Sequence, residues 1–385
     1  MWRNIASNAL TLLIVLAFLL AGLILWGKSQ YTSPGPLSEP ICLEVERGST
    51  MTAISRKLKA QGAVSNDLLY RVGTEYAGLN DDLKAGSFLV PEQASMAEIA
   101  DIVTRGGGST CGTEMLYRIG IADTRMELRE FDPITETYQT VAEHRSSSEE
   151  TRPEAFAGAR GAADTRYRIT MAEGVTSWQV MTALRDIQIL TGSVDTPPAE
   201  GTLAPDSYEL RAGETRQSVI DRMKEKQEFI LNSAWEDRAE GLPLETRQEA
   251  LILASIIEKE TGVAGERRQV ASVFVNRLER GMRLQTDPTV IYGITKGQRT
   301  LGRGLRQSEL RGETRWNTYV IDGLPPTPIA NPGRASIEAA LTPAQTDFVY
   351  FVADGSGGHA FAETLAEHNA NVAKWRRIEA ERNGD

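Results

Sequence analysis

The feature that most constrains this chain is an apolar run near its N-terminus. The run "ALTLLIVLAFLLAGLILW", from Ala9 to Trp26, is apolar apart from Thr11 and Gly22. It is about long enough to cross a bilayer as a helix, and the rest of the sequence contains no second run of this kind. The sequence therefore predicts one transmembrane helix, followed by a large domain on one side of the membrane.

A cleaved signal peptide is the alternative interpretation of this run. A signal peptide has a shorter apolar region, and an A-x-A-like cleavage site follows it. The next segment, "GKSQYTSPGPLSEP", has no such site, which favours an uncleaved anchor within residues 1–28 and a linker over residues 29–40. Arg3 and Lys28 flank the run almost evenly and do not fix its orientation. We expect the usual arrangement, with a short cytoplasmic tail and the large domain outside.

Length and composition limit the classes of function. The 385 residues are enough for two or three domains, and the net charge of −10 argues against a nucleic-acid partner, which needs a basic surface. The three histidines are His144, His359 and His368, and no HExxH motif occurs, so we expect neither a metal nor a cofactor. Cys42 and Cys111 could pair in an oxidising compartment or stay unpaired, and the sequence leaves both cases open.

A short pattern of alternating strand, turn and helix occurs three times. It covers residues 43–58, 88–103 and 169–184. Thr50, Ser95 and Thr176 occupy the expected N-cap positions, and Glu98 completes a capping box with Ser95. The pattern predicts small α+β modules, the first over residues 41–106. Chance similarity between strand–turn–helix units is the alternative.

The stretch between the second and third units has a different composition. Its middle, "HRSSSEETRPEAFAGARGAADTR", is polar and lacks apolar periodicity. Such a segment cannot bury much apolar surface, so residues 107–166 are predicted to form a flexible insertion, to which we assign no chemistry. Residues 167–385 are the predicted second domain, and the expected fold class is α+β, with a mixed α+β domain after the anchor and the small modules.

One helix of the second half has well-marked ends. In "LETRQEALILASIIEKETG", Thr246 and Glu249 form a capping box, so the helix is expected to begin near Arg247, and Gly262 is suited to the position just past its end. The next helix ends at Gly281 in the same way. A short helix capped by Asp287 and, later, a hairpin in "FVYFVADGSGGHAF" are also expected.

The first of these helices places an acid on its apolar stripe. At about 100° per residue, one face contains Leu251, Ala254, Ser255 and Glu258. Glu260 points to nearly the opposite side, so we expect it to face another layer or solvent. A carboxyl group among apolar neighbours is desolvated, which raises its pKa and lets it donate a proton to a leaving-group oxygen. A structural ion pair of Glu258 with Arg267 or Arg268 is the alternative.

The segments around this acid resemble a known family. The block "ASIIEKETG…ERRQVASVFVNRLERGMRLQTDPTVIYGI" is similar to the signature of the MltG/YceG-like family, the endolytic murein transglycosylases. "NTYVIDGLPPTPIANPG" and "YFVADGSGGHAF…HN" resemble later motifs of that family. The resemblance covers about residues 43–106 and the chain from 167 onward, and is most specific over 251–371. A membrane anchor, a LysM-like module and a catalytic domain are the family's organisation, in agreement with the anchor and the small modules.

The resemblance implies a reaction and a site. Family members cut the β-1,4 bond between N-acetylmuramic acid and N-acetylglucosamine inside a glycan strand and leave a 1,6-anhydro end. The family's catalytic acid falls on Glu258, which would protonate the leaving oxygen and then take the proton of the sugar's own 6-hydroxyl. The implied substrate-binding residues are Asp206, Tyr208, Ser255, Asn276, Arg277, Gln285, Thr286, Asp287, Tyr292, Asn317 and Tyr319. In "GTLAPDSYEL", Thr202 and Ala204 replace aromatic residues of the family pattern, so any stacking by those rings would be missing.

Two other functions stay open at this point. A glycan hydrolase could use Glu258 with Asp206 or Asp287 as a second carboxylate, and a non-catalytic scaffold could bind the cell wall through its LysM-like modules. The resemblance further implies a single-pass protein of the inner membrane with its catalytic domain in the periplasm, acting on nascent peptidoglycan strands and terminating their elongation. Penicillin-binding proteins of the wall-synthesis complex are the candidate protein partners.

Overall fold

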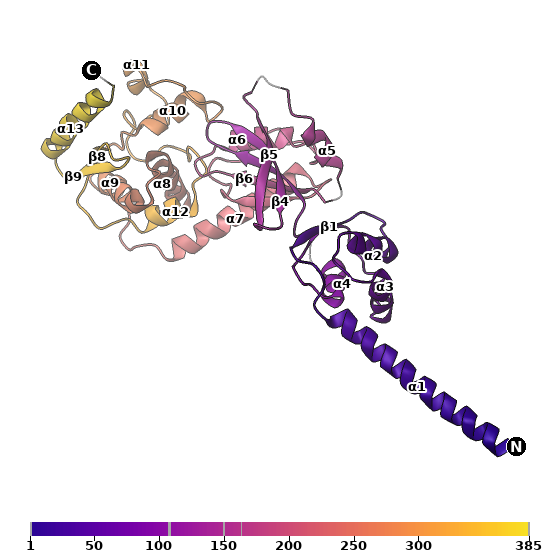
Figure 1. Ribbon diagram of the computed structural model, residues 1–385. Helices are drawn as coiled ribbons and strands as arrows, with labels where there is room; N and C mark the ends of the chain where they lie inside the picture. The colour runs from indigo at the N-terminus through magenta and orange to yellow at the C-terminus, as the bar shows by residue number, and fades with distance from the viewer. Residues whose placement is uncertain (1, 107–108, 149–150, 163, 384–385) are drawn as a thin grey trace. The chain divides into compact units, whose positions relative to one another are not determined.

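The computed structural model describes residues 2–106, 109–148, 151–162 and 164–383, and shows a mixed α+β protein (Figure 1). The chain divides into two compact units. The first comprises Met1–Leu116, Met126–His144 and Ser148–Tyr167, and the second comprises Tyr117–Arg125, Arg145–Ser147 and Arg168–Asp385. The predicted α+β class is thereby confirmed, and each unit is described in turn.

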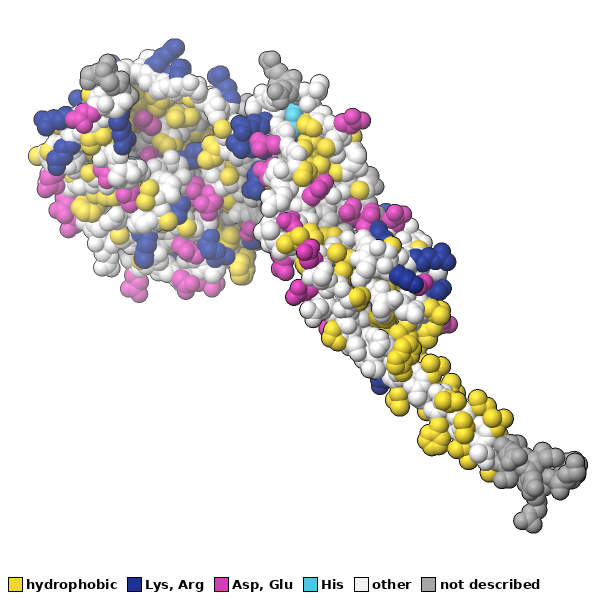
Figure 2. Space-filling view, viewed as in Figure 1, with side chains coloured by type: hydrophobic (Ala, Val, Ile, Leu, Met, Phe, Trp, Pro, Cys, Tyr) yellow, Lys and Arg dark blue, Asp and Glu magenta, His cyan; other side chains and the backbone are white. Residues whose placement is uncertain are grey.

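The N-terminal helix α1 (Trp2–Thr32) contains the apolar run. Its segment Leu10–Thr32 has a mean hydropathy of 2.6 over a window with no buried residues, and no other helix in the described ranges is long and apolar enough to cross a membrane. Figure 2 shows hydrophobic side chains along this helix. At its end, the ring of Tyr31 lies on Gly73, where a Cβ would collide with the ring. The last turn of α1 is therefore packed against α3 (Asp67–Tyr76).

The small module of the first unit has the order β1–α2–α3–β2–α4. Its elements are β1 (Ile41–Val45), α2 (Met51–Ala60), α3, β2 (Gly86–Val90) and α4 (Met96–Arg105). The two strands are antiparallel, with Leu43 opposite Phe88, and both of these side chains are buried together with Leu58 and Ile99. Apolar residues at helical spacing thus cover a two-stranded sheet.

The expected caps of the repeated unit are present. Thr50 and Ser95 accept hydrogen bonds from the N3 backbone of α2 and α4, and Glu98 completes the capping box of α4. Cys42 and Cys111 form a disulfide, with their Cα atoms 6.0 Å apart, which ties β1 to the segment that follows α4. The sequence left open whether Cys42 and Cys111 pair, and the structure shows that they do.

A five-stranded sheet has the order β5–β4–β3–β6–β7. Its strands are β3 (Thr113–Ile119), β4 (Thr124–Asp132), β5 (Thr137–Arg145), β6 (Arg166–Met171) and β7 (Ser207–Leu210), and α5 (Ala155–Gly161) lies between β5 and β6 in sequence. The prediction of a flexible insertion was therefore wrong for residues 113–145. Polar residues there occupy the exposed positions of strands: Met126 and Leu128 are buried, but most of β5 is not. A half-exposed sheet does not need an apolar sequence.

The second unit is built around the buried helix α8 (Arg247–Glu260). The other α-helices of this unit within the described residues are α6 (Ser177–Asp186), α7 (Arg216–Glu236), α9 (Arg267–Glu279), α10 (Asp287–Thr295), α11 (Gln307–Leu310), α12 (Arg334–Leu341) and α13 (Leu365–Asn383). All residues of α8 from Ala250 to Ile257 are buried, and α12, α9 and α7 pack against it. Its predicted capping box of Thr246 and Glu249 is present. The predicted hairpin is formed by β8 (Tyr350–Ala353) and β9 (His359–Ala362).

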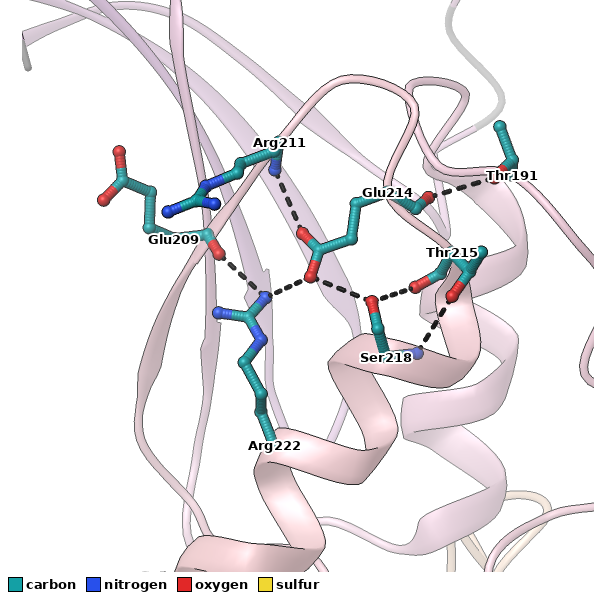
Figure 3. Close-up of polar contacts among 7 residues, drawn as sticks. All are labelled: Thr191, Glu209, Arg211, Glu214, Thr215, Ser218 and Arg222. Carbon is teal, nitrogen blue, oxygen red and sulfur yellow. Dashed lines mark hydrogen bonds and ion pairs between the residues drawn. The ribbon is translucent and has the colours of Figure 1, made fainter.

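The start of α7 is fixed by one carboxylate (Figure 3). Glu214 accepts hydrogen bonds from the N–H of Arg211 (3.1 Å), from the hydroxyl of Ser218 (3.0 Å) and from Arg222 (2.9 Å). Thr215 caps the helix through the N–H of Ser218 (3.1 Å). The carboxylate therefore joins the end of β7 to the first two turns of α7, a purely structural use of a glutamate.

Candidate active site

The carboxyl group of Glu258 lies where α8 leaves the core. The eight residues before it are buried, whereas Glu258 is partly exposed. Its Oε2 accepts a hydrogen bond from the N–H of Gly333 over 2.9 Å, and Gly333 is the N-cap of α12. The predicted apolar stripe is thus one side of a helix that is buried on all sides. Glu258 lies near the C-terminal end of this helix, where the helix becomes partly exposed.

The loop that reaches Glu258 is held by buried polar groups. Ser255 accepts a hydrogen bond from the N–H of Ile329 over 3.0 Å. Asn331, which is fully buried, donates to the carbonyl of Val175 (2.9 Å) and accepts from the N–H of Leu203 (3.0 Å). Asn331 was not among the predicted site residues, although it lies in the quoted motif "NTYVIDGLPPTPIANPG". Asn331 holds the loop by bonding to Val175 and Leu203, which are far from it in the sequence and could not be predicted as its partners.

A second carboxyl group, that of Glu173, contacts Gly333, the glycine whose N–H donates to Glu258. The side chain of Glu173 covers Gly333, and a Cβ added there would fall on its carboxyl group. Partial burial raises the pKa of Glu173, the charge of Glu258 raises it further, and Arg267 opposes the shift. Arg267 lies 3.9 Å from the Glu173 carboxylate. The sequence analysis missed Glu173, and its only local signal is an acid two residues after a strand.

A cavity of about 350 Å³ lies near the end of α8 and has Lys259, the residue after Glu258, in its lining. A Cβ at Gly174, in its wall, would lie 3.7 Å from Cγ of Glu258. Its lining includes the N-terminal part of α6, one side of α10 and the loop after it, among them Thr176, Gln179, Lys259, Tyr292, Arg299 and Ile329. A second cavity of about 290 Å³ shares Gln179, Arg299 and Thr300 with the first and adds Trp178. The two cavities adjoin at these shared residues, and each has one aromatic side chain in its lining, Tyr292 in the first and Trp178 in the second.

Two further ionisable groups lie near the first cavity: Lys259 in its lining, and Glu200 in contact with the lining residue Tyr292. Burial raises the pKa of Glu200, which accepts hydrogen bonds from the N–H of Ser177 (2.8 Å) and the hydroxyl of Tyr292 (3.2 Å). Burial lowers the pKa of Lys259, while the charges of Glu258 and Glu200 oppose that shift. Lys259 donates to the carbonyl of Gly174 over 3.3 Å. The ammonium group of Lys259 therefore interacts with the charges of two carboxyl groups, those of Glu258 and Glu200.

Glu260 faces another layer of the protein, which is one of the two placements predicted from the sequence. Its carboxyl group does not face solvent: it is partly buried and accepts a hydrogen bond from the hydroxyl of Thr286. Burial raises the pKa of Glu260, and Asp287 adds to the shift. Asp287 in turn accepts from the hydroxyl of Tyr319 over 2.7 Å. Three predicted binding residues thus gather around Glu260, on the other side of α8. Asp287 is the first residue of α10, and Thr286 holds the N-cap position.

The remaining predicted residues, apart from Gln285, have their polar groups engaged within the protein. Asn276 donates to the carbonyls of Thr346 and Phe348, Arg277 to those of Val349 and Leu284, and Asn317 to that of Gly312. Tyr208 donates to the carbonyl of Ala204 over 2.8 Å, and Asp206 pairs with Lys226. Gln285 is exposed, with a backbone φ of 48°. These contacts hold loops and the hairpin in place.

Neither predicted partner carboxylate is found with Glu258. Asp206 is engaged by Lys226, and Asp287 by Tyr319. The carboxyl group next to Glu258 is that of Glu173. Within the described residues there is no cluster of three or more Asp, Glu, His or Cys side chains that could hold a metal ion. The chemistry that this site offers is proton transfer by carboxyl groups.

Residues 43–374 match the YceG-like family. This chain is a member of the YceG-like family. The match includes Glu258, Gly333 and Glu173, so the groups described above lie inside the region that defines the family.

Two relatives and one solved structure are similar to parts of this YceG-like chain. An endolytic murein transglycosylase of Bacillus subtilis (strain 168) is 37% identical over 179 residues, 46% of this chain and 48% of the relative. One of Streptococcus pneumoniae serotype 2 (strain D39) is 25% identical over 342 residues, 87% of this chain and 58% of the relative. The chain thus spans about half the length of these relatives. The crystal structure of a putative yceG-like protein from Listeria monocytogenes, 24% identical, aligns with a TM-score of 0.43 over 86% of this chain and 99% of that one.

Proposed function

We propose that this YceG-like protein is an endolytic lytic transglycosylase of peptidoglycan, anchored in the inner membrane. It cuts the β-1,4 bond between N-acetylmuramic acid and N-acetylglucosamine within nascent strands and so terminates their elongation. The observation that carries the proposal is the position of Glu258 at the partly exposed end of a buried helix, where the N–H of Gly333 donates to one carboxylate oxygen and the next residue, Lys259, lines a cavity. The names of the two relatives support the same substrate.

One carboxyl group can perform both proton transfers of this reaction. Protonated Glu258 gives its proton to the glycosidic oxygen as the bond to C1 of N-acetylmuramic acid breaks. The 6-hydroxyl of the same sugar then attacks C1, and the carboxylate takes the hydroxyl proton, which yields a 1,6-anhydro end without water. The N–H of Gly333 stabilises the carboxylate between these steps, because a hydrogen bond to an ionised acceptor is stronger than one to a neutral acceptor.

The two adjoining cavities are suited to a sugar chain. Sugar rings present hydroxyls at their edges and C–H groups on their faces, so amides and hydroxyls can bond the edges and an aromatic ring can stack on a face. Thr176, Gln179 and Tyr292 line the first cavity and Trp178 the second. We assign these residues to sugar binding; of them, only Tyr292 was predicted from the sequence. A less direct candidate for sugar binding is the group on the other side of α8, made of Glu260, Thr286, Asp287 and Tyr319.

The location follows from the proposed substrate and the apolar helix. We propose that α1 spans the inner membrane and that residues 167–385 act in the periplasm, where peptidoglycan strands are made. The β1–α2–α3–β2 order supports a LysM-like module over residues 41–106 that holds glycan near the membrane. Penicillin-binding proteins, which make the strands, are the proposed partners.

Analysis of the reaction products tests the function. Full-length protein in detergent is incubated with purified peptidoglycan, and the released fragments are analysed by mass spectrometry, with Glu258→Gln as the matched variant. Fragments with 1,6-anhydro ends from the parent, and none from the variant, are expected. Reducing ends would instead indicate a hydrolase, for which Glu173 offers the second carboxyl group that such a mechanism needs. The absence of any cleavage would indicate a binding scaffold.

A further inference from the structure

The loop 296–306 connects α10 to α11 and is basic throughout. It contains four cationic residues and no acidic one, in a chain with 52 acidic and 42 basic residues. Two of the four, Arg299 and Arg303, line the first cavity together with Lys259, whereas no described Asp or Glu belongs to that lining. The cavity near the end of α8 therefore has a cationic lining, although the protein as a whole is acidic.

Three of the four loop cations are engaged by other groups of the protein. The ammonium group of Lys296 lies 3.5 Å from the centre of the Trp316 ring. Arg303 donates to both carboxylate oxygens of Glu309, over 2.6 and 2.9 Å, and the charge of Arg306 also acts on Glu309. These side chains hold the loop and α11 in place.

The fourth cation of the loop, Arg299, is different. It is exposed, and it forms no hydrogen bond or ion pair within the part of the chain that the structure describes. The backbone before it is fixed, because Thr176 donates to the carbonyl of Gly297 over 2.6 Å. Arg299 lines both cavities, so it lies where the two adjoin. A ligand that occupies either cavity would meet its positive charge.

The other charged side chains of the two linings have counter-charges. Lys259 interacts with the carboxyl groups of Glu258 and Glu200, which compensate part of its charge. Asp123, in the lining of the second cavity, lies 3.6 Å from Arg125. The charge that the described protein groups leave uncompensated at this junction is therefore that of Arg299.

The proposed substrate carries the complementary charge. Each N-acetylmuramic acid bears a lactyl group whose carboxyl group is either free or linked to a peptide, and the peptide has carboxylates of its own. N-acetylglucosamine has no such branch. A guanidinium can bind a carboxylate through two parallel N–H bonds, which makes it selective for this group.

We propose that Arg299 is a specificity-determining residue, which binds a carboxylate of the lactyl or peptide branch and so selects glycan that contains muramic acid over neutral glycan. This inference rests on the proposed function, because the carboxylate belongs to the proposed substrate. The cationic loop supplies the selection, and the neighbouring hydroxyls and amides of the cavities bind features that both kinds of glycan share.

Binding measurements with three soluble ligands of equal length test the proposal. They are peptide-bearing glycan fragments, the same fragments after an amidase has removed the peptides, and chitin oligomers, which have no carboxylate. Full-length protein in detergent with the substitution Glu258→Gln is used, so that the ligands are not cut. It should bind the first two ligands more tightly than the chitin oligomers, and salt should weaken only this preference.

The additional substitution Arg299→Gln should remove the preference. Binding of the carboxylate ligands should weaken about 3- to 10-fold, as for a partly exposed bidentate ion pair, and binding of chitin oligomers should stay the same. A loss confined to the peptide-bearing fragments assigns the carboxylate to the peptide, and a loss confined to the stripped fragments assigns it to the lactyl group. In the otherwise unchanged enzyme, Arg299→Gln should raise KM for peptidoglycan and leave kcat nearly constant.

Two matched variants separate this site from ordinary surface charge. Arg299→Lys keeps the charge and should retain most of the salt dependence. Arg376→Gln removes an exposed arginine of α13 that lies outside both linings and has no ion pair or hydrogen bond among the described residues, and it should not change binding. If Arg299→Gln binds all three ligands as Arg376→Gln does, the specificity role is wrong. If the parent cuts no peptidoglycan while Arg299→Gln still loses the preference, it is the proposed function that fails.

Discussion

The hydroxyl of Ser255 accepts a hydrogen bond from the N–H of Ile329, one turn of α8 before Glu258 accepts one from the N–H of Gly333. Successive turns of one buried helix thus hold both ends of the loop 329–333. The loop is fixed further by Asn331, so the donor that faces the Glu258 carboxyl group has little freedom to move. The proposed catalytic acid is thus positioned by the backbone of a neighbouring loop.

Replacement of Ser255 should therefore weaken both fold and site. In Ser255→Ala, the buried N–H of Ile329 loses its acceptor, which should cost about 1–3 kcal/mol of unfolding free energy. Urea unfolding measures this cost. Ser336→Ala is the control, because that hydroxyl is buried and has no hydrogen-bond partner among the described residues. A loss of equal size in both variants would contradict the importance of the Ile329 contact.

Glu258→Gln should abolish most of the cleavage while the fold persists. The amide keeps the size of the side chain and its oxygen can still accept from Gly333, but the proton that must move is gone. General acid–base catalysis typically contributes about 10²–10⁴-fold, and one group serves both steps here, so the loss should lie at the upper end of this range. Rates of fragment release and an unchanged melting curve check this. If the correctly folded variant cleaves at the parent's rate, Glu258 has a structural role.

Glu260→Gln should be far milder for activity and should change the pH dependence of stability. Burial raises the pKa of Glu260 above its ordinary value of 4.5, so the folded state binds its proton more tightly than the unfolded state does. The stability contributed by this group is present below about pH 4.5 and is lost as pH rises from there through the folded pKa. As the pH rises from about 4.5 through the folded pKa of Glu260, the variant should therefore become more stable relative to the parent. Thermal unfolding at several pH values measures the difference, and a constant difference would refute the expectation.

The disulfide should make a large contribution to the small module. Cys42 and Cys111 close a loop with a sequence separation of 69 residues. A bridge of this span restricts the unfolded chain, and its reduction should cost roughly 3–5 kcal/mol. Unfolding curves with and without reductant measure the loss. Free thiols counted under denaturing conditions in protein from the oxidising compartment would show that the pair does not form there.

Removal of residues 1–28 should release the protein from membranes. The remaining helices of the described chain are not long and apolar enough to span a bilayer. The cut leaves Tyr31, whose ring packs on Gly73, and so preserves the contact that ends α1. Vesicle flotation at high salt compares the truncated and full-length forms. Flotation of the truncated form would mean that another part of the chain binds the membrane.

Local patterns in the sequence determined the elements. The capping boxes at Ser95 and Thr246 predicted where α4 and α8 begin, because the side chain and the backbone groups that it satisfies lie within four residues of each other. The apolar run predicted α1, and helical periodicity placed Glu258 at the end of the α8 stripe. Residues 113–145 were misjudged because half-exposed strands alternate polar and apolar residues without an apolar total.

Only the tertiary structure decided which groups meet at Glu258. Gly333 and Glu173 are 75 and 85 positions away in the chain, and Asn331 joins segments that are more than 120 residues apart. No local pattern records such a meeting, since it depends on how α12, β6 and α8 pack. Local sequence patterns determined the helix and the helix face of Glu258. Only the tertiary structure decided its hydrogen-bond donor, Gly333, and the neighbouring carboxyl group of Glu173, because these contacts exist only when distant segments pack into one core.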